Sequence, residues 1–426
     1  MSKREPGLFW RAVGCLAIAG ILHIVVYSWC NQFTATRSDV GSLYFEWERN
    51  VPFVPWLIVP YWSLDFFFCG AFFLCLNRAE LRLLTLRLVF VVLASAACFL
   101  LFPMRFGWAR PEPQGWTAPL FHALYANDLP YNLAPSLHIS LRSLVWVVYG
   151  ASLRGWLRTT VKVWFILIGV STLLLWQHHF LDVATGFLMG WFVKAVIPAT
   201  TRRSVPSEPL HTKIAWAVGG LAAVCGAIAT LGGGWFWFGW LAVAFGIVAI
   251  AYARRDARFF GKENGTLTPA AEWCLLPWML LARAVQHRHL NGPPSRKIAP
   301  NVLLGRRHTA AEATALVAAG PLAVLDLRAE GNAPPAFREH AAFLNIPLLD
   351  LIPPPAAAVR EALDFIRAHQ AERTVLIHCQ LGLFRSATVA AAWLVESGAA
   401  PNNAAAVEFL RTIDPRIKPA TAGASG

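Results

Sequence analysis

The sequence predicts a polytopic α-helical membrane domain of about eight transmembrane helices, followed by a small α/β domain. Three observations lead to this fold class. Hydrophobic residues make up 56% of the 426 residues and charged residues only 14%, which is far from the composition of a soluble enzyme. Eight apolar runs, most of them near the length that spans a bilayer, fill the chain up to residue 253. Beyond residue 296, strand-like and helix-like stretches alternate, as in an α/β domain.

The eight apolar runs are nearly free of charge, which is typical of membrane spans. They cover residues 12–30, 51–76, 83–104, 139–153, 161–176, 183–198, 214–231 and 235–253, and the fourth is short. The first run lacks a small-residue cleavage site and further runs follow it, so we interpret it as a retained helix. Pro52, Pro55 and Pro60 predict a bent turn at the start of the second run. Asp65 in the same run is either a functional carboxylate or a hydrogen-bond partner of a neighbouring helix.

The positive charge of the chain follows the positive-inside rule. The net charge is +13, from 37 Lys and Arg against 24 Asp and Glu, and the excess lies in every second loop between apolar runs. We therefore expect a multi-pass protein of the cell inner (plasma) membrane with cytoplasmic N- and C-termini, which contacts the lipid bilayer and binds no nucleic acid. The basic residues concerned are Lys3, Arg4, Arg11, Arg78, Arg82, Arg87, Arg154, Arg158, Lys162, Lys194, Arg202, Arg203, Lys213, Arg254, Arg255, Arg258 and Lys262.

Two polar segments on the outer side of the membrane, in this orientation, carry groups that suit phosphate chemistry. Arginines and a hydroxyl can bind phosphate, a histidine held by a carboxylate can attack phosphorus, and a second histidine can protonate the leaving group. His178 and Asp182 are four residues apart, so a helix would place them on one face. A lone histidine at a helix end is more often an interfacial residue, but the combined pattern favours a site. Its candidate residues are Arg105, Arg110, Ser136, His138, His178 and Asp182.

On these motifs, residues 51–198 resemble the type-2 phosphatidic acid phosphatases, and within them the subgroup that includes the inositol phosphorylceramide synthases. The resemblance implies that His178 is a nucleophile that forms a phosphohistidine, that Asp182 orients it, and that His138 is the acid. Phosphate binding would fall to Ser136, Arg105 and Arg110.

Three features depart from the pattern of that family. Leu137 replaces a glycine, Thr172 replaces an arginine, and the basic pair Arg105 and Arg110 is more closely spaced than usual. The loss of one guanidinium should weaken phosphate binding. A phosphohistidine can be discharged by water or by an alcohol, so phosphatase and phosphotransferase activity both remain open.

The second candidate site lies in residues 375–394, VLIHCQLGLFRSATVAAAWL. Of the eight cysteines only Cys379 lies in a segment that suggests chemistry, because the others lie in or beside apolar runs. A strand leads into Cys379, a loop carries Gly382, and Arg385 and Ser386 open a helix. Such a loop can surround a phosphate with inward-facing amides, while the helix dipole and Arg385 favour the thiolate of Cys379.

This segment, together with IAPNVLLGRR and NIPLLDLIPPP, resembles the dual-specificity branch of the cysteine-dependent phosphatases over residues 298–417. The resemblance implies that Cys379 is the nucleophile, Arg385 the ligand of the phosphate and transition state, and Ser386 a hydroxyl that assists release of the thiolate. Asp350 would protonate the leaving oxygen and then activate water. His378 is expected to pack beside the loop and to help set the thiol pKa.

Further expectations concern the rest of this domain. Residues 323–327, 343–348 and 374–379 are predicted as strands, and residues 310–319 and 357–369 as helices. Asp326, at the end of the first of these strands, is interpreted as structural. The loop side chains are uncharged, which argues for a lightly phosphorylated substrate; these are Gln380, Leu381, Leu383 and Phe384.

The sequence thus predicts four segments. They are a six-helix phosphatidic acid phosphatase-like domain (1–210), two further transmembrane helices (211–253), a cytoplasmic or interfacial linker (254–295) and a dual-specificity-phosphatase-like domain (296–426). The arrangement resembles bacterial membrane proteins that fuse these two families.

The predicted function is that of a membrane phosphatase with two catalytic sites. The cytoplasmic cysteine site would hydrolyse phosphate monoesters, most plausibly of phospholipid headgroups, and the outer histidine site would hydrolyse or transfer a lipid-linked phosphate. The alternatives are a phosphoprotein phosphatase anchored by a lipid phosphotransferase, or by an inactive lipid-binding scaffold. No metal and no cofactor is expected, because no His and Cys spacing suggests zinc.

Overall fold

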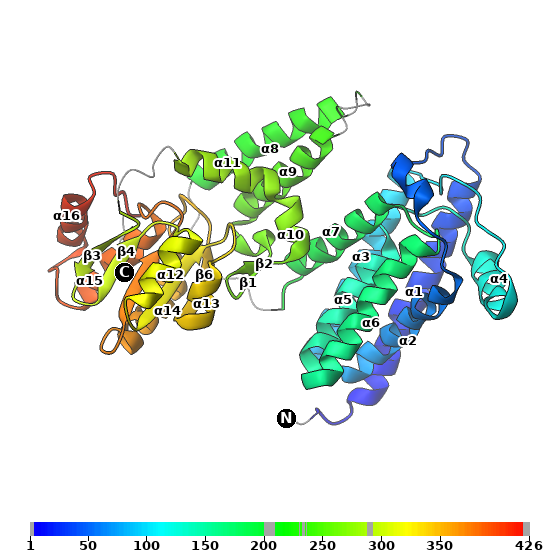
Figure 1. Cartoon of the computed structure of the whole chain (residues 1–426), viewed down its shortest axis with the longest axis horizontal. Helices are drawn as coiled ribbons and strands as arrows, with labels where there is room; N and C mark the ends of the chain where they lie inside the picture. The colour runs from blue at the N-terminus through cyan, green and yellow to red at the C-terminus, as the bar shows by residue number, and fades with distance from the viewer. Residues whose placement is uncertain are drawn as a thin grey trace. The chain divides into compact units, whose positions relative to one another are not determined.

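The computed structural model describes residues 4–199, 209–229, 231, 235, 237–287 and 293–420. The chain divides into two compact units, Met1–Thr200 and Thr201–Gly426 (Figure 1). Three basic residues used above to orient the chain, Lys3, Arg202 and Arg203, lie outside the described residues.

The first unit is a helical bundle, and each of the six apolar runs predicted before residue 200 forms a helix in it (Figure 1). As the prolines predict, the second run opens with a short 3-10 turn, η2, before its α-helix begins. The bundle helices are α1 (Leu8–Ala35), α2 (Ile58–Leu74), α3 (Arg78–Leu101), α5 (Leu137–Ser152), α6 (Gly155–Leu174) and α7 (Phe180–Val196). The connections hold η1 (Glu46–Asn50), η2 (Pro55–Leu57), η3 (Gly115–Thr117) and the helix α4 (Ala118–Asn127).

The distribution of small and large apolar side chains in the bundle is compatible with a membrane protein. Small side chains such as Ala12, Ala19 and Ala71 are buried between helices, whereas Trp10 and Phe66 are 77% and 79% exposed on the outside. Among the described residues, five helices are long and apolar enough to cross a membrane. They are Leu8–Ala35, Pro55–Leu74, Arg78–Leu101, Gly155–Leu174 and Leu210–Ala229.

The second unit begins with two apolar helices that pack against each other, α8 (Pro209–Ala229) and α9 (Phe238–Arg254). The segment that the sequence predicts as a linker then folds into short elements. These are η5 (Ala257–Phe260), the hairpin β1 (Lys262–Glu263) and β2 (Thr266–Leu267), α10 (Pro269–Cys274) and α11 (Leu276–His287).

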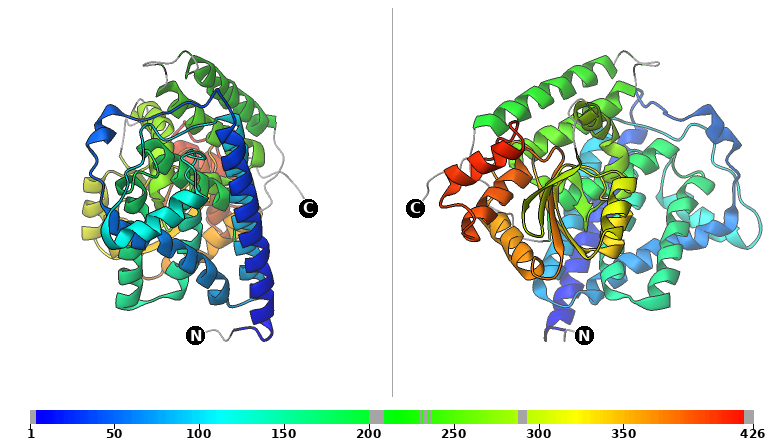
Figure 2. Two further views of the ribbon diagram at one scale, coloured as in Figure 1. Left: turned by 90° about the vertical axis from the view of Figure 1, so that its right-hand side faces the viewer. Right: turned by 60° about the vertical axis from the view of Figure 1, so that its left-hand side comes forward.

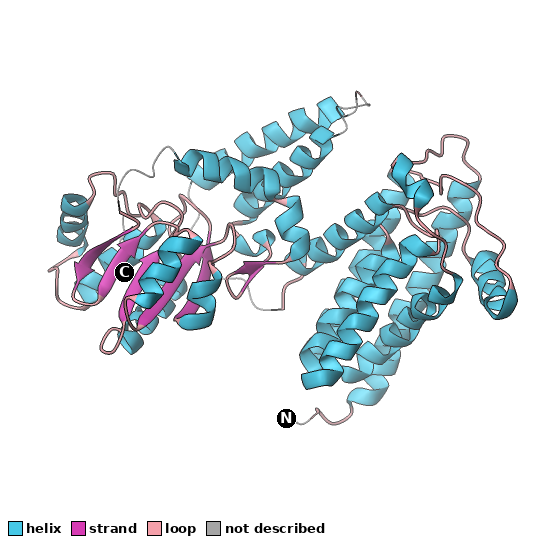
Figure 3. Ribbon diagram, viewed as in Figure 1, coloured by secondary structure: helices cyan, strands magenta, loops and turns pink. Residues whose placement is uncertain are grey.

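The remainder of this unit is an α/β domain around a five-stranded sheet (Figure 3). The strand order is β3-β4-β7-β5-β6, with β3 antiparallel to β4 and the other neighbours parallel. The strands are β3 (Ser295–Ala299), β4 (Val302–Gly305), β5 (Leu322–Arg328), β6 (Ala342–Leu348) and β7 (Thr374–His378). The α/β domain is thus confirmed, and the three predicted strands correspond to β5, β6 and β7. The strands β3 and β4 were not predicted.

Helices cover both faces of the sheet (Figure 2, right). One face packs against α12 (Ala310–Ala318) and α13 (Pro335–His340) around Phe337 and Leu376. The other packs against α14 (Ala356–His369), α15 (Arg385–Glu396) and α16 (Asn403–Ile413). Because both faces are covered, every residue of the interior strand β5 is buried. The carboxyl ends of β5, β6 and β7 meet at one edge, where ligand sites of parallel sheets lie.

Candidate active site

The loop between β7 and α15 brings together the thiol and the hydroxyl that the sequence singles out. The strand ends at His378, Cys379 follows it, and the helix begins at Arg385. The Cys379 Sγ lies 3.1 Å from the Ser386 Oγ and accepts the Gly382 N–H at 3.3 Å. The Ser386 hydroxyl and the Gly382 amide are both groups that can donate a hydrogen bond to sulfur, and the N-terminus of α15 lies beside it.

The loop is fixed from its outer side. The Gln380 carbonyl accepts the Arg307 N–H at 3.1 Å, and the Leu383 carbonyl accepts the Lys418 N–H at 3.0 Å. In a trans peptide the N–H points away from the C=O, so the amides that follow these two carbonyls point toward the inside of the loop. Inward-facing amides of this kind form an anion-binding concavity.

Gly382 is required by this geometry. Its φ is +79°, a region that only glycine adopts without strain, and an added Cβ would lie 3.0 Å from the carbonyl C and O of Gly305. The loop therefore packs directly against the end of β4.

Arg385 is the best-anchored charged side chain of the site. Its guanidinium is fully buried and donates from Nη1 and Nη2 to the two carboxylate oxygens of Glu330, at 2.9 and 2.5 Å. Nη1 also donates to the Leu348 carbonyl at 2.9 Å. Burial disfavours the Glu330 carboxylate, but Arg385 outweighs this effect, and the pKa of Glu330 lies below its ordinary value. Sequence reasoning missed Glu330, which lies 55 residues before Arg385.

Asp350, the predicted general acid, lies at the same edge of the sheet, just after β6. One of its carboxylate oxygens is 3.2 Å from the Arg385 Nε, and its side chain is 36% exposed. Leu351, the next residue, has a φ of +57°, which is strained for a side chain of this size. The candidate acid thus lies in a tight loop that faces solvent and the guanidinium together.

Asp326 is structural, as expected, and the structure gives the reason. Its fully buried carboxylate accepts the Lys262 Nζ at 2.8 Å and the Arg328 Nε at 3.0 Å. Burial raises the pKa of Asp326, but the two cations prevail and lower it overall. His378 is fully buried at the end of β7, and burial lowers its pKa to about 3. Its contribution to the thiol pKa stays a prediction.

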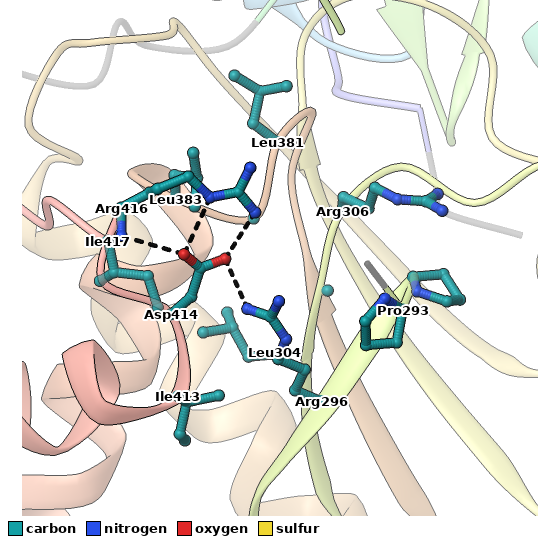
Figure 4. Close-up of a pocket in the computed structure, with 13 residues that line it drawn as sticks. Pro293, Arg296, Leu304, Arg306, Leu381, Leu383, Ile413, Asp414, Arg416 and Ile417 are labelled. Atoms are coloured by element: carbon teal, nitrogen blue, oxygen red, sulfur yellow. Dashed lines mark hydrogen bonds and ion pairs between the residues drawn. The ribbon is translucent and has the colours of Figure 1, made fainter. Parts of the chain in front are cut away.

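A pocket lies against the outer side of the same loop, lined by Leu381, Gly382 and Leu383 together with the ends of β3 and α16 (Figure 4). It has basic side chains, but two of them are neutralised: Asp414 accepts Arg296 at 2.5 Å and Arg416 at 2.8 Å. This ion-pair cluster anchors the segment whose Lys418 holds the loop.

The first unit gathers most of the other predicted site residues at one end of its bundle. Ser136 is the N-cap of α5, and its backbone N–H donates to the Asp182 carbonyl on α7 at 3.0 Å. His138 lies in the first turn of α5 and stacks on Tyr61 with ring centroids 4.2 Å apart. Arg110 donates to the Asp128 carbonyl at 2.5 Å, and its guanidinium lies 3.6 Å from the Asp128 carboxylate.

His178 and Asp182 lie next to each other, but not on one helix face. The helix α7 begins at Phe180, so His178 precedes it, and Asp182 instead caps the helix by accepting the His179 N–H at 2.7 Å. The His178 Nδ1 is 3.6 Å from the Asp182 carboxylate, which is too long for a hydrogen bond.

The neighbouring His179 is fully engaged. Its Nε2 accepts the Gly107 N–H at 3.0 Å and its Nδ1 lies 3.1 Å from the Glu48 carboxylate, so the ring is held as the Nδ1–H tautomer. Arg105 and Asp65 are not among the contacting residues around His178 and His179. Both side chains are exposed, and neither makes a hydrogen bond or ion pair within the described part of the chain.

Three buried nitrogens of this cluster have no hydrogen-bond partner among the described residues: Arg110 Nε, His138 Nε2 and His178 Nδ1. His178 interacts electrostatically with both His138 and Asp128, so the groups are close to one another. Burial raises the pKa of Asp128, although Arg110 opposes the shift. Unsatisfied buried polar groups are rare, and a cluster of them indicates a site for a polar ligand or water. Asp128 was not predicted.

Comparison with known proteins bears on the second unit of the chain. Residues 309–422 match the family model of the dual specificity phosphatase catalytic domain. The chain thus carries a dual-specificity phosphatase catalytic domain, which implies hydrolysis of phosphate esters. No curated protein matches the chain.

Several solved structures are similar to the chain, each over less than a third of its length. The active form of Tk-PTP is 24% identical over 29% of this chain and 87% of that one, with a TM-score of 0.28. PTPMT1 in complex with PI(5)P is 21% identical over 30% and 87%, with a TM-score of 0.28. Human DUSP28 is 26% identical over 30% and 86%, with a TM-score of 0.25.

Proposed function

We propose that the protein is a membrane phosphatase whose cysteine site removes phosphate from the headgroup of a phospholipid. The observation that carries the proposal is the contact of the Cys379 sulfur with the Ser386 hydroxyl and the Gly382 amide, beside the buried guanidinium of Arg385. The thiolate attacks phosphorus, the P–O bond to the headgroup breaks, and Asp350 gives its proton to the leaving oxygen. Asp350 then deprotonates a water molecule, which releases phosphate and regenerates the thiolate with the help of Ser386.

Two features support a lipid as the substrate. Five helices long and apolar enough to cross a membrane bring the catalytic domain to the bilayer, where phospholipid headgroups are concentrated. The loop side chains are uncharged, which suits a headgroup with one phosphomonoester better than a multiply phosphorylated one; they are Gln380, Leu381, Leu383 and Phe384.

We propose that the protein crosses the cell inner (plasma) membrane eight times and has both termini in the cytoplasm. The helices α5, α7 and α9 have 16, 17 and 17 residues and would cross the bilayer as its shortest spans. A tag at the C-terminus should resist protease in intact cells and be cleaved after permeabilisation. Cleavage in intact cells would overturn this orientation.

A second proposed site lies on the outer side, around His178, and resembles that of the type-2 phosphatidic acid phosphatases. Its support is the cluster of buried nitrogens on Arg110, His138 and His178 that have no hydrogen-bond partner among the described residues, which suits the binding of a polar group such as a lipid phosphate. The His178 ring attacks phosphorus, and His138 protonates the leaving group. Water or an alcohol then takes the phosphoryl group from His178, so the product is free phosphate or a new ester.

The experiment that tests both sites is phosphate release by the full-length protein. The substrates are phosphatidic acid, phosphatidylglycerophosphate, a phosphatidylinositol phosphate and a phosphotyrosine peptide. Cys379→Ser should abolish release from the preferred lipid, whereas Cys69→Ser, which changes an exposed cysteine, should not. His178→Ala should remove only the activity of the outer site, with exposed His122→Ala as its control.

The same experiment separates the alternatives. Loss of peptide turnover alone in Cys379→Ser would support a membrane-anchored phosphoprotein phosphatase. Lipid binding without turnover at the His178 site would support a scaffold, for which Leu137 and Thr172 give a sequence reason. Transfer to an added alcohol that competes with hydrolysis would support a phosphotransferase.

A further inference from the structure

The end of the apolar helix α9 contacts the loop that carries the candidate general acid. Tyr252, two residues before the end of α9, is only 5% exposed, and its hydroxyl donates to the Asp350 carbonyl at 3.2 Å. The two residues are 98 positions apart in the chain. The hydroxyl therefore restrains the backbone of the acid and not its carboxylate.

A restraint at this point matters because the loop is strained. Leu351 has a φ of +57° and is 48% exposed, so little packing holds its left-handed conformation. The carbonyl that Tyr252 binds belongs to the peptide between Asp350 and Leu351. Without that hydrogen bond the peptide is free to rotate, and the Asp350 carboxylate would move with it.

The segment that follows α9 is bound in the same way to the loop that carries Glu330. The Lys262 Nζ lies in the buried ion pair with Asp326, and the Ala333 N–H donates to the Gly265 carbonyl at 2.8 Å. Asn332 accepts the Leu267 N–H at 2.7 Å and donates to the Glu272 carboxylate at 3.0 Å; these two contacts use its Oδ1 and its Nδ2. The contacts fall on both sides of Glu330, which holds the guanidinium of Arg385.

We propose that residues 252–272 form a clamp that positions both catalytic loops, and that Tyr252 is the positioning residue for Asp350. The first arm of the clamp is Tyr252, which fixes the backbone of the acid Asp350. The second arm is residues 262–272, which fix the loop of Glu330 and, through Glu330, the guanidinium of Arg385. The proposal rests on the phosphatase reaction proposed above for the cysteine site. It makes the membrane helix α9 part of the catalytic apparatus.

Substitutions in the two arms should differ in how strongly their effect on kcat depends on the leaving group. A general acid matters for a poor leaving group and little for a good one, whereas the arginine acts on the phosphoryl group in both cases. In the full-length protein, Tyr252→Phe should lower kcat for phenyl phosphate about 10-fold but for p-nitrophenyl phosphate less than about 2-fold. Asp350→Asn should show the same order of effects with a larger loss. Asn332→Ala should lower turnover of both substrates.

Two further measurements keep the test decisive. Hydrogen exchange of the amides at residues 350–352 should be faster in Tyr252→Phe and unchanged in Tyr131→Phe, a tyrosine of the other unit; this readout needs no activity. Equal losses on both phosphates, or unchanged exchange, would overturn the clamp. In a His178→Ala background, which removes the proposed outer activity, turnover that survives Cys379→Ser would instead overturn the proposed reaction and leave the exchange result standing.

Discussion

The bidentate pair between Glu330 and Arg385 gives the sharpest prediction. Glu330→Gln keeps the shape of the side chain and removes its charge. Two opposite charges about 4 Å apart attract by about 4 kcal/mol at the effective dielectric constant of a protein site. The amide oxygen of glutamine retains one hydrogen bond, and Asp350 remains 3.2 Å from the guanidinium, so about half of this attraction should be lost. We expect about 2 kcal/mol less free energy of unfolding.

The catalytic activity of Glu330→Gln should fall by more than its loss of folding free energy alone would suggest. Arg385 must hold the phosphoryl oxygens in a fixed orientation, and a guanidinium anchored on one side only loses that orientation. Removing one preorganised interaction with a transition state costs about 10²-fold, so kcat/KM should fall about 10- to 100-fold. The assays are turnover of p-nitrophenyl phosphate and thermal unfolding of the full-length protein, in which the transition of the second unit should shift down by about 6 °C.

A matched control is available in the same unit. Glu312 pairs with Arg306 at 2.9 Å, but these side chains are 28% and 13% exposed and lie outside the catalytic loop. Glu312→Gln should cost less than about 1 kcal/mol and leave kcat/KM unchanged. The reasoning is refuted if Glu330→Gln turns over substrate like the wild type, or if both variants lose activity equally.

Three further outcomes are expected. Gly382→Ala should lower kcat/KM at least about 10-fold because the new Cβ meets the Gly305 carbonyl, whereas Gly398→Ala, with φ +75° and open space around it, should cost only about 1 kcal/mol of strain. As pH falls below 6.5, the unfolded chain binds protons that buried His378 does not, so urea titrations should show declining stability from that pH downward. A second decline should follow below about pH 4, where the unfolded chain protonates carboxylates such as Asp326 and Glu330 whose folded pKa is lowered; a flat profile from pH 7 to 3 would contradict both assignments.

Most of what the sequence predicted for the catalytic domain came from residues that are close together in the chain. A strand, a loop with glycine and a helix opened by Arg385 are consecutive in the chain, so their arrangement follows from short-range geometry. The strands β3 and β4 have five and four residues around a turn at Asn301, too short for alternation to distinguish them from loop. Glu330 and Tyr252 reach their partners across 55 and 98 residues, and no local pattern reports such a contact.

The outer cluster shows where spacing misleads. The interval between His178 and Asp182 suits a helix face, but the helix begins two residues after His178. Asp182 is then its third residue, where a carboxylate can accept the free N–H of the residue before the helix, here His179. An acidic residue three positions into a helix is a start signal, and with that signal the sequence would have placed His178 in the preceding turn.

The position of Lys262 has a consequence for how such proteins can be recombined. Its ammonium group forms a buried ion pair with Asp326, although Lys262 lies 33 residues (295 − 262) before the start of β3. A chimaera that joins a different anchor at residue 296 would leave a buried carboxylate with Arg328 as its one strong cationic partner among the described residues. A catalytic domain that is moved to a different membrane anchor must therefore keep the chain from near the end of α9 onward. The junction of such a chimaera belongs within the helices α8 and α9 and not in the segment that follows them.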